Sequence, residues 1–340
     1  MTFKKVIGTG GIGSGVIYRL ESNRALGRNE SRMAYRQDQQ DFCKLHIILH
    51  YVSVLLRDLK RSVPILPIGA VGEDDVAVRI LKLMQTAGMD VRYVASMKGT
   101  PTLFSTCYQF PDGAGGNLTE ANSASEKVTP RLVARIGKEL QAARGQCMVL
   151  AAPEVPMASR ITLLELGRKY GACNAASFVT DELLEVKKRK LLGMVDILSV
   201  NIEEAALLGG ISPESKSDRI VDACTKRVTQ LNTDIRLAVT DGPAGAYGIE
   251  GGKKLFLRNF NEKVENAAGA GDAFLGGLMI GTVLGLPFIS RDVASSLHLA
   301  RAIANMKVRS PHTISFDVNL RSLRAFASER KQTRLRKALE

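Results

Sequence analysis

A glycine-rich segment near residue 270 holds the residue types that phosphoryl transfer requires. It reads Asn266-Ala267-Ala268-Gly269-Ala270-Gly271-Asp272 and opens an apolar helical segment. The small residues Gly269, Ala270 and Gly271 let backbone N–H groups converge at a helix N-terminus, where the helix dipole favours negative charge. Asp272 would stand beside them as a general base for an acceptor hydroxyl. The segment predicts an anion hole with a catalytic carboxylate; the alternative is a tight turn in which Asp272 only caps the helix.

Three more segments accompany this one in a fixed order along the chain. They are Asn174-Ala175-Ala176-Ser177, then Asn201-Ile202-Glu203-Glu204 after an apolar run, and Thr240-Asp241-Gly242-Pro243-Ala244-Gly245 after the next apolar run. Together with G-A-G-D they resemble the signatures of the ribokinase-like (PfkB) family of sugar and nucleoside kinases. Ile68–Asp74 and Gly88-Met89-Asp90 match the N-terminal half of that family. The resemblance covers about residues 3 to 308.

This resemblance implies an enzyme that uses ATP and Mg²⁺ to phosphorylate a sugar, sugar phosphate or nucleoside. It implies that Asp272 is the base, with Gly269, Ala270 and Gly271 as the anion hole. Asn201 and Glu204 would order Mg²⁺ through water, and the nucleotide site would be lined by Asn174, Thr240, Gly242 and Gly245. A lid that includes about residues 101–117 would close over the acceptor, and such lids pair in homodimers.

The acceptor half departs from the family pattern. Asn266-Ala267 stands where the family has Asp-Thr, which removes a carboxylate and a hydroxyl and puts a monovalent-cation site there in doubt. The Gly-Gly signature with its Asn is absent from Ile48–Ser53, where its spacing places it. Gly13 or Ser14 stands where an Asp should bind the sugar. The motifs expected to bind the nucleotide therefore match the family, whereas those expected to bind the acceptor are replaced by other residues.

Replacement acceptor residues are expected in the segment Gly27–Arg32. Arg28, Asn29 and Arg32, with Gly13, could hold a polyhydroxylated or phosphorylated acceptor, because arginine binds phosphate in a bidentate manner. The alternative is a solvated, charged loop. His46 and His50, four residues apart on a predicted helix, lack a third metal ligand and are expected to pack or hydrogen-bond.

Two rival functions remain open at this level. Gly8–Gly13 matches the dinucleotide fingerprint G-x-G-x-x-G, but the polar stretch that follows has no second strand to present an acidic residue. A nicotinamide enzyme is therefore disfavoured. The other rival is a nucleotide sensor on a kinase scaffold, which the missing acceptor signature supports and the retained Asp272 opposes.

The surrounding elements alternate between strand-like and helix-like patterns, which predicts a doubly wound, mainly parallel α/β sheet with a small β lid. Buried strands are expected at Met148–Ala152, Ile197–Val200 and Arg236–Thr240. Amphipathic helices are expected at Phe42–Arg57, Val76–Ala87, Arg131–Arg144, Met157–Tyr170 and Thr180–Leu192, with a long apolar helix from Asp272.

Composition fits a globular cytoplasmic protein of 340 residues, with 45% hydrophobic and 24% charged residues. Five cysteines without a C-x-x-C pair indicate reduced thiols. No apolar run reaches the roughly 20 residues that span a membrane, and no signal peptide opens the chain. Of the net charge of +13, the last forty residues carry ten Lys and Arg against three Asp and Glu. Residues 1–308 are expected to form the kinase domain and 309–340 a basic extension, with nucleic-acid binding not favoured.

Overall fold

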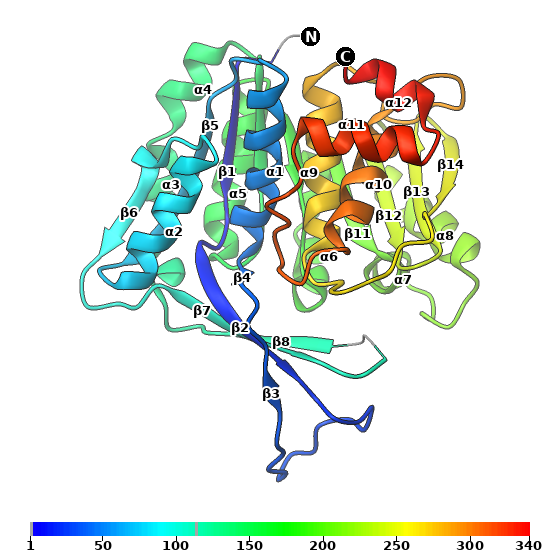
Figure 1. Cartoon of the computed structure of the whole chain (residues 1–340). Coiled ribbons are helices and arrows are strands. Elements are labelled where there is room, and N and C mark those ends of the chain that lie inside the picture. The colour runs from blue at the N-terminus through cyan, green and yellow to red at the C-terminus, as the bar shows by residue number, and fades with distance from the viewer. Residues whose placement is uncertain (1–2, 113–114) are drawn as a thin grey trace.

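A nine-stranded sheet forms the centre of the computed structural model, which describes residues 3–112 and 115–340. The strand order is β14-β13-β12-β11-β10-β9-β1-β5-β6, parallel from β12 to β6, with β13 and β14 antiparallel at one edge (Figure 1). The strands are β1 (Lys5–Thr9), β5 (Ile65–Gly72), β6 (Val94–Met97), β9 (Cys147–Ala151), β10 (Cys173–Ala176), β11 (Ile197–Asn201), β12 (Arg236–Asp241), β13 (Gly245–Glu250) and β14 (Lys253–Arg258). The expected doubly wound, mainly parallel sheet is confirmed.

The inner strands are apolar on both faces because helices cover both sides of the sheet. All residues of β5 and β9 are buried, and Ile7 of β1 pairs with Leu66 on one side and Val149 on the other. Parallel strands that are buried on both faces read as continuous apolar runs rather than as alternating patterns. The predicted strands Met148–Ala152 and Ile197–Val200 are confirmed for this reason, within one residue at each end.

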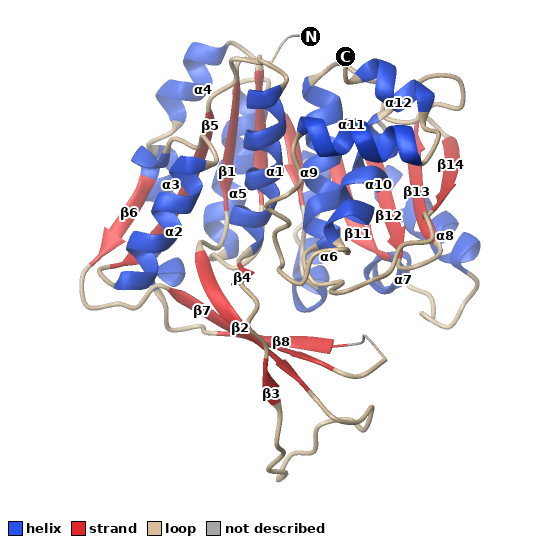
Figure 2. Ribbon diagram, in the orientation of Figure 1, coloured by secondary structure: helices blue, strands red, loops and turns tan. Residues whose placement is uncertain are grey.

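Helices form a layer on each face of the sheet (Figure 2). One layer packs into a large core cluster and contains α1 (Lys44–Asp58), α2 (Asp75–Thr86), α9 (Ala270–Val283), α10 (Ser296–Lys307), α11 (Leu320–Glu329) and α12 (Thr333–Ala338). The other layer contains α3 (Pro130–Ala134), α4 (Gly137–Ala143), α5 (Met157–Lys169), α6 (Leu183–Lys188), α7 (Ile202–Gly209) and α8 (Ser217–Thr229). Short 3₁₀ turns lie at Val91–Tyr93, Ala124–Lys127, Thr180–Glu182 and Leu191–Met194.

A second, five-stranded sheet projects from the carboxyl end of β1 (Figure 1). Its strands are β2 (Gly13–Arg19), β3 (Tyr35–Arg36), β4 (Asp41–Phe42), β7 (Leu103–Gln109) and β8 (Gly115–Thr119). We call this sheet the lid. The expected insert 101–117 supplies β7 and the start of β8, and its Gly113 lies outside the described residues. The remaining lid strands come from residues 13–42. The glycines at positions 8–13, which match the dinucleotide fingerprint, lie where the chain passes from β1 directly into β2. In this described stretch no helix follows β1, although a dinucleotide-binding fold would require one there.

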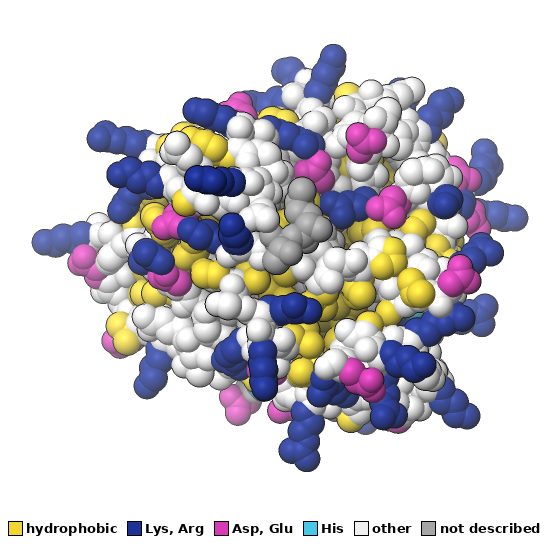
Figure 3. All heavy atoms as spheres, turned by 90° about the horizontal axis from the view of Figure 1, so that it is seen from above, with side chains coloured by type: hydrophobic (Ala, Val, Ile, Leu, Met, Phe, Trp, Pro, Cys, Tyr) yellow, Lys and Arg dark blue, Asp and Glu magenta, His cyan; other side chains and the backbone are white. Residues whose placement is uncertain are grey.

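Residues 309–340 fold onto the body. Leu323, Phe326 and Leu335 of α11 and α12 are buried in the main core cluster. Arg309 and Arg330 both pair with the buried Glu262. At the end of the molecule where both termini lie, basic side chains are spread around the outline rather than gathered in one strip (Figure 3). Among the described residues, none of the helices has the length and apolar character to cross a membrane.

Glycines allow α9 to pack closely between α1 and α10. A β-carbon on Gly277 would lie 2.4 Å from the Cα of Ala300, and one on Gly281 would lie 2.6 Å from the Cα of Ser296. On the side that faces α1, a β-carbon on Gly276 would lie 3.1 Å from the carbonyl oxygen of Ile48. These contacts hold the buried helix, and therefore its N-terminus, in one position.

We expect Gly277→Ala to destabilise the fold by about 1–3 kcal/mol, because the added methyl forces α9 and α10 apart. The matched control is Gly137→Ala in α4, where the nearest side-chain atom to an added β-carbon is 4.0 Å away. That change should be neutral or slightly stabilising through helix propensity. Thermal unfolding of both variants measures the difference, and equal midpoints would contradict the packing argument.

Candidate active site

Asp272 lies in the first turn of α9, where two cavities meet. Gly269, with φ of 81°, is the N-cap of this helix, so Asp272 does not cap it. A cavity of about 340 Å³ lies between the body and the lid, and a second of about 160 Å³ lies at the carboxyl ends of β11 and β12. Asp272, Gly269 and Lys44 line both cavities. The Asp272 carboxylate therefore lies at the boundary of both cavities.

The smaller cavity brings together three of the six residues expected to bind the nucleotide or Mg²⁺, together with two glycines of the loop before α9. Its lining includes Asn201, Glu204, Thr240, Gly269 and Gly271. Asn201 Oδ1 accepts the Glu204 N–H at 2.7 Å, and Glu204 Oε2 accepts the Asn201 N–H at 2.9 Å, which forms a capping box at the start of α7. Burial raises the pKa of Glu204, and the nearby Lys44 opposes this shift. The same two side chains thus begin a helix and face the cavity.

Three residues expected on the nucleotide side do not line either cavity. Asn174 lies within β10, and its amide donates to the carbonyl oxygens of Leu164 and Met194 at 2.9 and 2.8 Å. Gly242 and Gly245 form the turn between β12 and β13, where both have positive φ. These positions stabilise the strands that carry the site.

The loop before α9, which the sequence predicts to be an anion hole, is a tight turn. The N–H of Ala270 donates to the carbonyl oxygen of Ala267 at 3.1 Å, so this group closes the turn. A β-carbon on Gly269 would lie 2.4 Å from the carbonyl oxygen of Thr313. Only glycine therefore fits at this position. Gly269 and Gly271 face the cavities, whereas Ala270, expected as part of the anion hole, does not line them.

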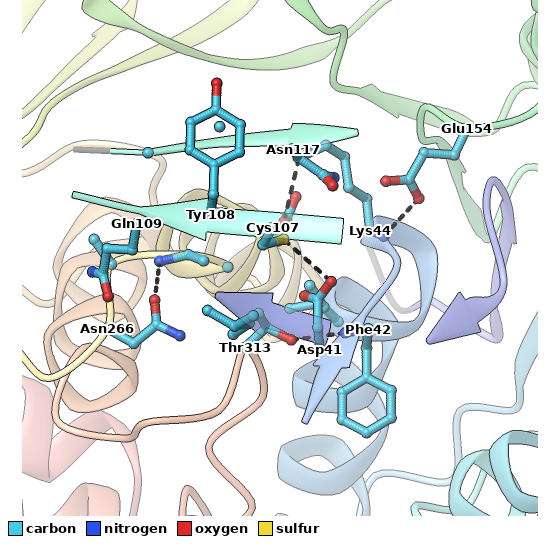
Figure 4. Close-up of a pocket in the computed structure, with 18 residues that line it drawn as sticks. Asp41, Phe42, Lys44, Cys107, Tyr108, Gln109, Asn117, Glu154, Asn266 and Thr313 are labelled. Atoms are coloured by element: carbon cyan, nitrogen blue, oxygen red, sulfur yellow. Dashed lines mark hydrogen bonds and ion pairs between the residues drawn. The ribbon is translucent and has the colours of Figure 1, made fainter. Parts of the chain in front are cut away.

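The larger cavity contains charged residues that the sequence did not reveal (Figure 4). Lys44, the first residue of α1, places its ammonium 3.7 Å from Asp272 Oδ2, and its backbone N–H donates to Glu154 Oε2 at 2.9 Å. Asp41 in β4 accepts from the Ser105 hydroxyl at 2.6 Å and from the Cys107 thiol at 3.3 Å. Asp41, Glu154 and Asp272 thus line the same cavity as Lys44, and Asp272 is the carboxylate paired with its ammonium.

Burial dominates the electrostatics of these groups. It raises the pKa of Asp41, whose side chain accepts several hydrogen bonds that oppose the shift. It also raises the pKa of Glu154 to about 7, against the attraction of Lys44. The Asp272 carboxylate raises the pKa of Lys44 above its usual range, so Lys44 stays charged. The ammonium beside Asp272 is therefore a permanent positive charge where the two cavities join.

The sequence matches the pfkB family carbohydrate kinases over residues 52–319. The chain belongs to this family. It is 26% identical to the pseudouridine kinase of Escherichia coli K12 over 258 residues, which are 74% of this chain and 77% of that protein. This kinase also shares its fold with the ribokinase of Giardia lamblia, with a TM-score of 0.78, 17% identity, and coverage of 97% of this chain and 99% of the other.

Two further solved structures have the same fold. The ribokinase of Cryptococcus neoformans in complex with ADP gives a TM-score of 0.75 at 17% identity, with 95% of this chain and 99% of that chain covered. The nucleoside kinase of Burkholderia thailandensis in complex with inosine gives 0.72 at 18% identity, with 95% and 97% covered. At such identities the likeness concerns the fold.

The position at which the family's acceptor signature is missing lies within α1. The spacing pointed to Ile48–Ser53, which lies in the middle of the buried helix. Lys44, the first residue of this helix, and Asp41 of the preceding strand β4 line the larger cavity instead. A local signal was present in the sequence, because Asp41 and Lys44 lie within four residues of Leu45, where the apolar run starts.

The candidate acceptor residues of the Gly27–Arg32 segment lie away from the cavities. Arg28 and Asn29 are exposed in the loop between β2 and β3, at the outer part of the lid (Figure 1). The Arg32 guanidinium pairs with Glu30 and donates to the carbonyl oxygen of Arg24. Gly13 is buried in β2, where a β-carbon would meet the carbonyl oxygen of Leu103. The structure does not bring these four residues to the site.

His46 and His50 pack with aromatic rings, as the packing alternative predicted. Their ring centroids are 6.3 Å apart, and they contact Phe42 and Phe316. Burial lowers the pKa of His46 to about 3 and that of His50 to about 4, so both rings are neutral. Among residues 3–112 and 115–340, no group of three His, Cys, Asp or Glu side chains is placed to hold a metal ion.

We expect Glu154→Gln to gain stability relative to the wild type as pH rises from about 5 to about 8. The raised pKa means that the folded protein binds a proton on Glu154 that the unfolded chain has already released, so the wild type loses stability over this interval. Gln keeps the acceptor for the Lys44 N–H and carries no charge. Urea unfolding of both proteins across this pH range measures the effect, and a constant difference would refute it.

Proposed function

We propose that this kinase transfers the γ-phosphoryl group of ATP to a hydroxyl group of an uncharged sugar or nucleoside, with Asp272 as the general base. The observation that carries the proposal is that Asp272 and Lys44 line both cavities. The donor would occupy the smaller cavity and extend over the turn between β12 and β13. The acceptor would occupy the larger one, under the lid.

The donor side suits a nucleotide with Mg²⁺. Solved relatives of this fold include a ribokinase in complex with ADP and a putative ribokinase II in complex with ATP and Mg²⁺. Asn201 and Glu204 offer carboxamide and carboxylate oxygens, the hard ligands that Mg²⁺ prefers, and the remaining ligands would be phosphate oxygens and water. The ion would neutralise part of the phosphate charge.

The transfer step needs a base and a place for negative charge. The acceptor oxygen forms a bond to the γ-phosphorus, the bond from that phosphorus to the bridging oxygen of ADP breaks, and the hydroxyl proton goes to the Asp272 carboxylate. Backbone N–H groups of Gly269 and Gly271 and the Lys44 ammonium would stabilise the charge on the moving group. The lid would exclude water, which otherwise competes as the acceptor.

The charges of the larger cavity favour an acceptor without a phosphate. Three carboxylates, Asp41, Glu154 and Asp272, line it, and among the described residues in its wall Lys44 is the one cation, already paired with Asp272. A phosphate there would lack a free cation and face acidic groups. Hydroxyl groups can instead donate to Asp41, and the Gln109 and Asn117 amides of the lid can bind a polar ring.

We expect Asp272→Asn to lower kcat by about 100-fold to 10,000-fold, because the proton acceptor is lost. ATP affinity should be retained, since the change keeps the size of the side chain. ADP formation from Mg·ATP with a panel of sugars and nucleosides measures kcat, and calorimetry measures ATP binding. Asp218→Asn, at a surface ion pair with Lys254, is the control.

Two results would contradict the proposed role of Asp272. One is a variant that turns over as fast as the wild type. The other is a wild-type protein that binds ATP and forms no ADP with any acceptor, which is the behaviour of a nucleotide sensor.

We expect Asp41→Asn to raise the KM for the acceptor by about 10-fold to 100-fold, the value of a hydrogen bond to a charged group. The KM for ATP should not change, because Asp41 lines only the acceptor cavity. Asp38→Asn, an exposed carboxylate three residues earlier, is the matched control.

Faster turnover of a sugar phosphate than of the parent sugar would contradict the proposal that the acceptor is uncharged.

A further inference from the structure

A buried ammonium lies beside the loop that opens α9. Lys307, the last residue of α10, has no solvent exposure, and its Nζ donates to the main-chain oxygen of Asn266 at 2.8 Å. Desolvation lowers the pKa of Lys307 to about 7, and the Asp41 and Asp272 carboxylates oppose this shift. Additional negative charge at the loop, such as that of a phosphoryl group, favours the ammonium form further. Burying an ammonium costs several kcal/mol unless nearby groups compensate it. Because burial of the Lys307 ammonium is costly, its position beside the loop before α9 indicates that it contributes to the function of this loop.

The loop rests on Lys307 and on the chain that follows α10. Asn266 Oδ1 accepts the Ala268 N–H at 2.9 Å, and Asn266 Nδ2 donates to the carbonyl oxygen of Pro311 at 2.7 Å. Thr313 packs against Gly269, and its hydroxyl accepts the Phe42 N–H at 2.9 Å. The region around Lys307 therefore joins the anion-hole loop to β4 of the lid, which carries Asp41.

Lys307 also balances the negative charges of the site. The two carboxylates that favour its charged form are Asp41 and Asp272. Both line the larger cavity, where a third carboxylate, Glu154, adds to their repulsion. A positive charge behind the loop offsets part of this repulsion, and it favours a phosphoryl group at the backbone N–H groups of Gly269 and Gly271.

The residues at this loop do not fit the monovalent cation that the family resemblance suggests there. Asn266 and Ala267 replace a carboxylate and a hydroxyl. Both polar atoms of the Asn266 side chain are bonded within the chain, and its main-chain oxygen accepts from Lys307. An alkali cation binds through several oxygen ligands, and here these oxygens already have donors.

We propose that the Lys307 ammonium is a built-in cation that positions the anion-hole loop, so that phosphoryl transfer by this kinase needs no free monovalent cation. The inference rests on the proposed function and extends it. Lys307 does not touch the reacting atoms; it acts through Asn266 and is a positioning residue.

The activity test compares the 340-residue chain and three variants in buffers whose monovalent cation is either K⁺ or tetramethylammonium. Wild-type kcat should be the same in both. Lys307→Met should lower kcat by about 10-fold to 100-fold in both, less than the loss of an oxyanion donor itself. Lys307→Ala also leaves room for a small ion, so K⁺ should restore part of its kcat and tetramethylammonium should not.

Arg301→Met is the matched control. It removes another buried cation of α10, whose guanidinium donates to the Arg258 carbonyl oxygen and to Gln332 at 2.9 Å each, away from the loop. It should change stability and leave kcat and its response to K⁺ unaltered. The KM for ATP should also stay constant in Lys307→Met if the lysine acts on the transfer step rather than on nucleotide binding.

Thermal unfolding without substrates supplies a readout that does not depend on turnover. K⁺ should raise the Tm of Lys307→Ala above its value in tetramethylammonium and should leave the wild type unchanged. A wild-type kcat or Tm that depends on K⁺ would overturn the inference, as would a Lys307→Met variant with wild-type kcat. A wild type that forms no ADP with any acceptor refutes the proposed function instead, and the Tm comparison then decides the role of Lys307 alone.

Discussion

The site depends on one packing constraint: helix α9, which is buried from Asp272 to Thr282, begins where two cavities meet. Gly277 and Gly281 let it approach α10, and Gly276 lets it approach α1. Since α1 begins at Lys44 and α10 ends at Lys307, the same contacts bring both lysines toward the loop before α9. The helix dipole then adds to two ammonium charges at one place. The way in which three helices meet thus favours negative charge at this loop.

The second feature of the site is the density of buried charge. Asp41, Glu154 and Asp272 line one cavity, with Lys44 among them and Lys307 behind the loop. Each of these groups costs free energy to bury, and the opposite charges offset that cost only in part. A protein that needed stability alone would place apolar residues here. This cluster of buried charges is consistent with the proposed reaction, in which the donor brings negative charge into the site and the acceptor loses a proton.

Local signals in the sequence identified the parts of the fold that local physics controls. Buried parallel strands such as β9 and β11 read as short apolar runs, and the glycines before Asp272 marked a helix N-terminus with a carboxylate in its first turn. The Asn201–Glu204 spacing marked a capping box that also faces the smaller cavity. Each of these features lies within a few residues along the chain, so its pattern is visible without the fold. The predicted helix 131–144 was less accurate, because it breaks into α3 and α4.

The acceptor side could not be derived in this way. Asp41 and Glu154 are 113 positions apart, and Lys307 lies farther still along the chain. No local pattern links these residues. The arginine-containing segment Gly27–Arg32, which was predicted to bind the acceptor, lies in the outer part of the lid instead. The sequence by itself determined the family, the sheet and the position of the loop before α9, because these follow from short motifs and apolar periodicity. Only the tertiary structure decided which charged residues meet around the larger cavity, because burial and proximity arise when distant segments pack together.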